Sequence, residues 1–200
     1  MLAVTSLLDS KHTDLVNTII LDFEKEFGVK QVQATPDPHL TYLTTEALNR
    51  DLLKDYLDRV CHYGDAFHVY TTGIGVFPGE HPVIYIPILR TQPLNKFHSK
   101  LYKDISKLSI EVGQFSQPKF WMPHISLALH DTSLDMMTPM FKYLALLNFN
   151  WEIKVDNLTI FREKQKENDT EPVYEKEAEY FLSNRVLGWL SANLIFVSNR

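Results

Sequence analysis

The chain has one cysteine, no long apolar run and no excess of positive charge, and each absence excludes a class of protein. Cys61 is the only cysteine in 200 residues, so neither an internal disulfide nor a zinc cluster of cysteines can form. We expect Cys61 to be a small buried hydrophobic residue. No apolar stretch reaches the ~18 residues of a membrane span, and the N-terminus lacks the basic and apolar regions of a signal peptide. These features predict a cytoplasmic protein.

The charge balance is acidic, with 20 Lys and Arg against 25 Asp and Glu and a net charge of −5. Proteins that grip duplex DNA need many contacts between Lys or Arg and phosphates, so duplex DNA is an unfavourable partner. A few local donors are still sufficient to bind one phosphate. We therefore expect a small ligand or the end of a strand.

Several sequence motifs of common enzymes are also missing. The chain contains no C-x-x-C, no H-E-x-x-H and no G-x-S-x-G, which removes support for a zinc hydrolase or a serine hydrolase. The glycines at 73, 75 and 79 do not give G-x-G-x-x-G, and they precede a strand rather than a helix, so a dinucleotide site is not indicated.

The hydrophobic periodicity predicts helices that alternate with strands. Expected strands cover residues 2–8, 39–44, 66–72, 83–89, 124–129, 151–162 and 172–182, and expected helices cover 10–27, 46–63, 93–112 and 134–147. We expect turns at 73–82, a loop at 115–123 and a charged hairpin tip at 163–171. This order indicates two similar halves and an α+β fold with antiparallel sheets. Residues 1–182 are expected to form one bilobal domain, and residues 183–200 a tail of unassigned role.

Two short segments resemble each other, one in each predicted half. They are Pro38-His39-Leu40-Thr41 and Pro123-His124-Ile125-Ser126. In a strand, residues i and i+2 point to the same face about 6–7 Å apart, so each histidine would share a face with its hydroxyl residue. If the halves face each other, two imidazoles and two hydroxyls converge in one cleft. That set suits a phosphodiester, because hydroxyls hold non-bridging oxygens while histidines move protons.

A histidine followed two positions later by Ser or Thr is common, and His130-Asp131-Thr132 is a third instance here. The proline before each motif, the aliphatic residue within it and its equivalent place in both halves distinguish the matched pair. We expect His130 and the other five histidines to be structural or surface residues.

The paired H-x-[T/S] motifs resemble the two-histidine (2H) phosphoesterase superfamily, which includes bacterial 2′-5′ RNA ligases and RNA 2′,3′-cyclic phosphodiesterases. Residues 73–78 followed by 83–87 are also similar to the turn and strand that this family has between its motifs. The similarity covers residues 1–182. Ser126 stands where the ligase-like branch more often has Thr, which bears on the subfamily more than on the chemistry.

The resemblance implies a bilobal fold with the active site between two antiparallel sheets, no metal and no other cofactor. It also implies that His39 and His124 are catalytic, with His39 as acid and His124 as base for opening a cyclic phosphate, and that Thr41 and Ser126 bind the phosphate. The expected substrate is an RNA 3′ end, a short oligonucleotide or a cyclic nucleotide, and the expected state is a monomer.

Residues beside the motifs are candidates for substrate contacts. An aromatic side chain can stack on a base, and a lysine can meet a second phosphate. The candidates are Tyr42, Phe77, Phe120 and Trp121 for stacking and Lys119 for the phosphate. The alternative for each aromatic side chain is packing in the core, and for Lys119 it is solvation at the surface.

Three alternatives stay open. The same four groups would serve a phosphodiesterase of 2′-5′ oligoadenylates or of small cyclic nucleotides. A binding module would hold an RNA end or nucleotide without converting it. An interaction protein would use the apolar tail, with dispensable histidines.

Overall fold

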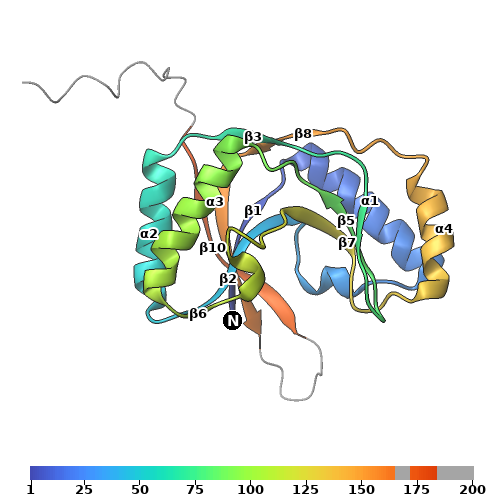
Figure 1. The fold of residues 1–200 in the computed structure, drawn as a ribbon, viewed down its shortest axis with the longest axis horizontal. Helices are drawn as coiled ribbons and strands as arrows, with labels where there is room; N and C mark the ends of the chain where they lie inside the picture. The colour runs from blue at the N-terminus through green and yellow to red at the C-terminus, as the bar shows by residue number, and fades with distance from the viewer. Residues whose placement is uncertain (165–171, 184–200) are drawn as a thin grey trace, which may run out of the picture.

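The computed structural model describes residues 1–164 and 172–183, which form antiparallel sheets covered by helices (Figure 1). The larger sheet has the strand order β10-β9-β1-β2-β6. Its strands are β1 (Leu2–Leu7), β2 (His39–Ala47), β6 (Ser109–Val112), β9 (Asn157–Lys164) and β10 (Val173–Phe181). The N-terminal strand is therefore central and pairs with strands from both halves of the chain.

The second sheet combines three strands with a two-stranded extension. The strands β4 (Gly75–Phe77), β5 (Val83–Pro87) and β7 (His124–Ala128) pair in that order, and β3 (Phe67–Tyr70) pairs with β8 (Glu152–Val155). A bridge between Thr71 and Ile88, and a hydrogen bond of 2.7 Å from the Leu89 amide to the Tyr70 carbonyl, join the two parts. β7 lies against β2, where the two sheets meet.

The helices divide between the sheets. α2 (Arg50–Tyr63) and α3 (Gln92–Ile105) pack on the larger sheet, whereas α1 (Ser10–Phe27) and α4 (Leu134–Leu144) lie together beside the second (Figure 1). Because α1 follows β1 of the larger sheet but contacts β7 of the other, the two halves are interleaved along the chain. The predicted α+β fold with antiparallel sheets is confirmed.

Helix α1 shows how local sequence fixes an element. The Asp9 side chain accepts a hydrogen bond of 3.0 Å from the His12 amide and caps the first turn. Gly28 ends the helix at φ 73°, a left-handed conformation that glycine adopts without strain. The predicted bounds agree with those observed.

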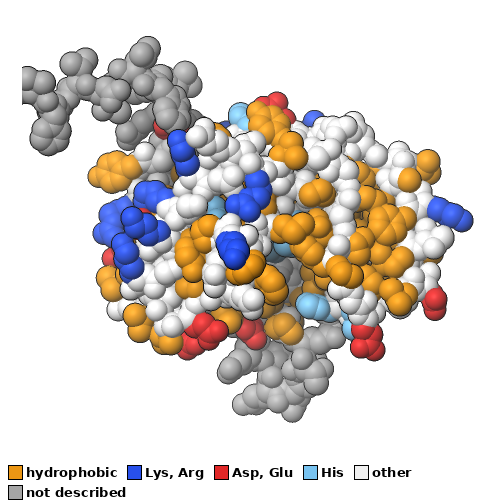
Figure 2. All heavy atoms as spheres, in the orientation of Figure 1, with side chains coloured by type: hydrophobic (Ala, Val, Ile, Leu, Met, Phe, Trp, Pro, Cys, Tyr) orange, Lys and Arg blue, Asp and Glu red, His pale blue; other side chains and the backbone are white. Residues whose placement is uncertain are grey.

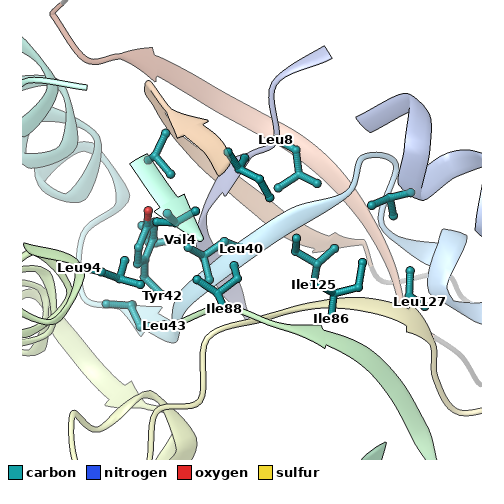
Figure 3. Close-up of a cluster of buried hydrophobic side chains, with 14 of the residues drawn as sticks. Val4, Leu8, Leu40, Tyr42, Leu43, Ile86, Ile88, Leu94, Ile125 and Leu127 are labelled. Carbon is teal, nitrogen blue, oxygen red and sulfur yellow. The ribbon is translucent and has the colours of Figure 1, made fainter. Parts of the chain in front are cut away.

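One cluster of buried side chains draws on both sheets (Figure 3). Leu40 of β2 and Ile125 of β7 are the middle residues of the two motifs, and both are completely buried. Removing such a side chain from water is worth about 1.5–3 kcal/mol. The cluster around them includes Val4, Leu8, Tyr42, Leu43, Ile86, Ile88, Leu94 and Leu127. Burial of each central aliphatic residue thus fixes the face that its histidine and hydroxyl neighbours take.

Three predicted helices are shorter than expected, and the fourth of the chain ends at Leu144 rather than at residue 147. The second begins at Arg50 rather than at residue 46, because Glu46 and Ala47 continue β2 and pair with β6. The third ends at Ile105 rather than at residue 112, because residues 109–112 form β6. The errors in the second and third helices have one cause: β2 and β6 supply each other's hydrogen bonds, and helical periodicity does not report such pairing.

Two predicted strand regions also differ. The expected strand over 151–162 is two strands, β8 and β9, which separate at Asp156 and join different sheets. The expected turn region over 73–82 contains β4, which pairs with β5. In the predicted hairpin tip, residues 163 and 164 belong to β9 and residues 165–171 lie outside the described residues.

The predicted tail lies, apart from Ser183, outside the described residues. Cys61 is buried as expected, with 2% of its surface exposed. Over residues 1–164 and 172–183, none of the helices combines the length and apolar character that a bilayer crossing requires.

Candidate active site

The two histidine motifs begin the strands β2 and β7. In β2 the partly exposed His39 and Thr41 alternate with the buried Leu40, and in β7 His124 and Ser126 do the same around Ile125. The predicted alternation is confirmed in both motifs. Each histidine therefore shares one strand face with a hydroxyl group two residues away.

Both imidazoles are held in the same way by the backbone. The Nδ1 atom of His39 lies 2.7 Å from the Asp37 carbonyl oxygen, and Nδ1 of His124 lies 2.6 Å from the Met122 carbonyl oxygen. A carbonyl can only accept, so Nδ1 carries the proton and Nε2 is the basic atom of the neutral ring. The carbonyl belongs in each case to the residue before the motif proline, so the Pro-His sequence builds the same tautomer twice.

Aromatic side chains pack against the two imidazoles. The ring centroids of His39 and Phe161 are 5.2 Å apart. His124 has two such neighbours, Phe77 at 5.1 Å and Tyr85 at 5.2 Å. These contacts restrict the ring orientations that the carbonyls select.

A glycine makes room for one of these aromatic side chains. Tyr85 stacks on Phe77 with ring centroids 4.2 Å apart, and it crosses β4 at Gly75, its partner in the sheet. A Cβ atom on Gly75 would lie 2.4 Å from the Tyr85 ring, closer than any real Cβ contact. A side chain at position 75 would therefore displace the ring that supports His124.

A cavity of about 520 Å³ brings residues of the two motifs together. His39 and Thr41 from β2 and Ser126 from β7 line it. Its other walls come from α1, the 32–38 segment, β9 and β10, and include Asn17, Gln33, Thr35, Asp37, Leu129, His130, Phe161 and Tyr174. His124 is not a lining residue, but it shares the β7 face of Ser126.

Electrostatics connect the two histidines. Burial lowers the pKa of His39 below its ordinary 6.5, the charge of His124 lowers it further, and the bond to the Asp37 carbonyl opposes the shift. Burial also lowers the pKa of His124, against the effect of the Met122 carbonyl. Burial therefore disfavours the protonated, charged form of each imidazole, and protonation of one opposes protonation of the other. Such a pair suits one neutral and one protonated histidine.

Among the described residues, no three His, Cys, Asp or Glu side chains converge as ligands of a metal ion would. The described lining of the cavity also contains no Lys or Arg side chain. Among the described lining residues, the side chains that can carry positive charge are the imidazoles of His39 and His130.

Two predicted stacking residues prove to be core residues. Tyr42 is completely buried, and its hydroxyl shares a hydrogen bond of 2.9 Å with Ser6. Trp121 is 4% exposed and stacks on His98 at 3.7 Å. For these two residues core packing is observed in place of an exposed face for a base: Tyr42 lies on the core face of β2, and Trp121 packs on His98 of α3. The Trp121 indole instead donates a hydrogen bond of 2.9 Å to the Thr41 carbonyl and supports the site from behind.

The other predicted contacts stay predictions. Phe77 adjoins His124. Lys119 and Phe120 are exposed on the loop before the second motif, with the ammonium group 5.2 Å from the centre of the Phe120 ring. Neither residue lines the cavity.

Most lining residues of the cavity were not expected at the site, among them Phe161, Tyr174 and His130. Phe161 and Tyr174 come from β9 and β10, and their place depends on the pairing of β9 with β1. His130, predicted to be structural or at the surface, follows β7 at the cavity wall with φ 69°. This left-handed backbone is uncommon for a residue with a side chain and often marks a functional site. A sequence signal existed only for His130, in the histidine-hydroxyl pattern that it repeats.

A family model described as the 2′-5′ RNA ligase superfamily matches residues 12–167, which include both motifs. The chain belongs to this superfamily. The predicted two-histidine phosphoesterase family is thereby confirmed. A search of curated protein sequences found no match to this chain.

Solved structures share the fold of this superfamily member at low identity. TT0787 of Thermus thermophilus is 19% identical with a TM-score of 0.64, and the match covers 90% of this chain and 97% of that one. E. coli LigT complexed with 3′-AMP is 18% identical with a TM-score of 0.59, covering 91% and 97%. At these identities the similarity shows the fold alone, and it agrees with the α+β architecture described above.

Proposed function

We propose that this protein opens 2′,3′-cyclic phosphates at the ends of RNA or short oligonucleotides, as a monomer and without a metal ion. The observation that carries the proposal is the matched pair of imidazoles. Both donate Nδ1–H to the carbonyl two residues earlier, which leaves Nε2 as the basic atom in each. Thr41 and Ser126 accompany them on the same strand faces.

In the proposed reaction, a water oxygen forms a bond to phosphorus while the bond from phosphorus to one ribose oxygen breaks. One neutral imidazole takes a proton from the water, and the other, protonated, gives a proton to the leaving ribose oxygen. The product is a 2′- or 3′-phosphomonoester. A 5′-hydroxyl in place of water would give a phosphodiester, which is ligation. Family resemblance assigns the acid to His39 and the base to His124.

The hydroxyls of Thr41 and Ser126 would donate hydrogen bonds to the non-bridging oxygens, where charge builds in the transition state. The cavity wall also suits a nucleoside, because Phe161 and Tyr174 supply aromatic surface and Asn17 and Gln33 supply amides. E. coli LigT has been solved with 3′-AMP and with ATP. By analogy, a nucleotide is the ligand class that we propose here.

The decisive experiment measures opening of a short RNA that ends in a 2′,3′-cyclic phosphate, in the presence of EDTA. We expect turnover by the wild type and turnover slower by about 10²–10⁴ by His39→Ala or His124→Ala, with folding of each checked by circular dichroism. His62→Ala removes an exposed imidazole on α2 and serves as the matched control. Whether the product carries a 2′- or a 3′-phosphate identifies the bond that breaks.

The pH dependence provides a second readout. Since the pKa values of His39 and His124 both lie below 6.5, we expect a bell-shaped profile of kcat/KM with its maximum below pH 6.5. A single inflection, or loss of activity on chelation, would contradict the scheme. Turnover of 2′-5′ oligoadenylates or small cyclic nucleotides alone would keep the chemistry and change the substrate. Binding without turnover would favour the binding module.

A further inference from the structure

A basic surface lies on α3 and on the loop before the second motif, which Arg90 and His98 hold together. Residues 90–119 contain six Lys and Arg against two Asp and Glu, while the whole chain has 20 against 25. The rest of the chain therefore carries 14 positive against 23 negative residues. We define the basic surface as these six exposed side chains, Arg90, Lys96, Lys100, Lys103, Lys107 and Lys119. On the face drawn in Figure 2, Lys and Arg gather over α2 and α3, whereas hydrophobic side chains predominate over β5, β7 and α4.

Most of the basic surface is one row along a helix. Lys96, Lys100 and Lys103 lie on α3, and Lys107 lies in the turn that follows. Their spacing of four, three and four residues places them on one side, over a length of about 16 Å. The opposite side of α3 is buried through Leu94, His98, Leu101 and Ile105.

The carboxylates near this row do not neutralise it. Asp104 is shared by Lys100 at 3.1 Å and Lys107 at 3.8 Å. Among the described residues, no carboxylate pairs with Lys96 or Lys103. One acidic side chain thus serves two lysines, and the others stay available to an anionic partner.

Arg90 connects the row to the active site. Its guanidinium group donates hydrogen bonds to the carbonyls of Trp121 at 3.1 Å and Pro118 at 3.0 Å. Trp121 also stacks on His98 of α3. These contacts fix the 113–123 loop, which carries Lys119 and leads into His124, against the first half of α3.

Exposed aromatic side chains accompany the charges. On the 113–123 loop, Phe115 is 76% exposed and Phe120 is 46% exposed. Cationic side chains that follow a backbone, together with aromatic faces that accept bases, are the features by which proteins bind single-stranded nucleic acid.

We propose that the basic surface binds the upstream part of a single-stranded RNA whose 3′ end lies between His39 and His124. The inference rests on the proposed function for the position of that end. The terminal nucleoside occupies the cavity beside His39, and the preceding nucleotides pass His124 and Phe120 toward the lysines of α3. The preferred substrate is then an RNA strand of several nucleotides rather than a mononucleotide or a dinucleotide.

The test compares two double variants with the same charge change. Lys96→Glu/Lys103→Glu alters the basic surface, and Lys11→Glu/Lys142→Glu alters exposed lysines of α1 and α4. The probes are a fluorescent RNA dodecamer with a 3′-phosphate, for binding by anisotropy, and cyclic-phosphate substrates of two and twelve nucleotides, for turnover. Binding is measured over a range of salt concentrations.

We expect the first variant to bind the dodecamer about tenfold more weakly or worse, and its salt slope to decrease by about 1.4, since each lost contact with a single strand removes about 0.7. Its kcat/KM should fall on the dodecamer and stay within about twofold on the dinucleotide, because base and phosphate contacts at the active site are unchanged. The control variant should resemble the wild type on both substrates.

Equal weakening by both variants, or by neither, would overturn the basic surface as an RNA site. So would binding of anionic lipid vesicles, but not RNA, through the same lysines. If the dinucleotide is turned over but the lysine variant binds and converts the dodecamer like the wild type, this inference is rejected and the proposed function stands. RNA binding that depends on the lysines, with no turnover of either substrate, would support the surface and reject the proposed function.

Discussion

The half-site around His39 and the half-site around His124 have the same local chemistry in different surroundings. Each imidazole donates Nδ1–H to the carbonyl two residues earlier and has a hydroxyl two residues later. His39, however, opens onto the cavity, and among the described residues its one aromatic neighbour is Phe161. His124 lies against Phe77 and Tyr85 and follows the loop that carries Lys119 and Trp121. The motif therefore builds the same histidine-hydroxyl unit twice, and the surroundings decide what each copy contacts.

The geometry within the motifs treats the two histidines alike, so the motifs cannot assign the acid and base roles. Burial lowers the pKa of both, and a bound phosphate would favour the proton on whichever ring faces it. The assignment consequently depends on how the substrate lies between the cavity and the basic surface.

The largest expected effect comes from removing either imidazole. His39→Ala and His124→Ala should each lower kcat by about 10²–10⁴, measured under steady-state conditions. Because the two act as a unit, the double variant should be little worse than the weaker single variant. If one histidine proves dispensable, the equivalence of the two half-sites is broken. Each single variant should also lose one of the two ionisations in the pH profile.

The hydroxyls test the equivalence more finely. Thr41→Val and Ser126→Ala should each lower kcat by about 10² through loss of one donor to the developing charge. Ser126→Thr keeps the hydroxyl and should retain most activity, which makes it the matched control. A change in KM alone would mean that the hydroxyls bind substrate and transition state equally.

Acid should lower the folding stability that depends on the stack of His98 and Trp121 behind the site. His98 stacks on Trp121, which binds the Thr41 carbonyl, and burial lowers the pKa of His98 from 6.5 to about 4. The unfolded chain takes up this proton as the pH falls below 6.5, while the folded chain does not. The folded state therefore has its full stability above pH 6.5 and loses roughly 3 kcal/mol as the pH falls to 4.

Urea denaturation of the wild type and of His98→Gln between pH 7 and 4 measures this effect. The variant has no imidazole to titrate at this position, so its stability should depend less steeply on pH. Identical pH slopes for the two proteins would refute the assignment to His98.

The smallest effect should be confined to the His124 half-site. Gly75→Ala forces the Tyr85 ring away, at a cost of about 1–3 kcal/mol in folding stability, and should lower kcat by disturbing His124. Gly79→Ala is the control, because a Cβ there meets no atom closer than 4.0 Å. Equal behaviour of the two variants in thermal unfolding and in kcat would show that Tyr85 does not support His124.

Much of the fold followed from local patterns. The bounds of α1 agree with the prediction because its apolar spacing, its Asp9 cap and Gly28 are all local features. The predicted start of α2 and the predicted end of α3 were wrong, since the pairing of β2 with β6 is set by contact between distant segments. In the site, the alternation around Leu40 and Ile125 was predictable, whereas the burial of Tyr42 and Trp121 in stacks and hydrogen bonds with distant residues was not.

By itself, the sequence determined the two Pro-His-aliphatic-hydroxyl units, the strand face that each uses and the family to which the chain belongs. These depend on residues within a few positions of each other, where periodicity and proline act. Only the tertiary structure decided that Phe161 packs on His39, that the Tyr85 ring occupies the space beside Gly75 and that His130 lines the cavity. Neighbours across a sheet depend on which strands pair, and β1 pairs with β9 from the far end of the chain.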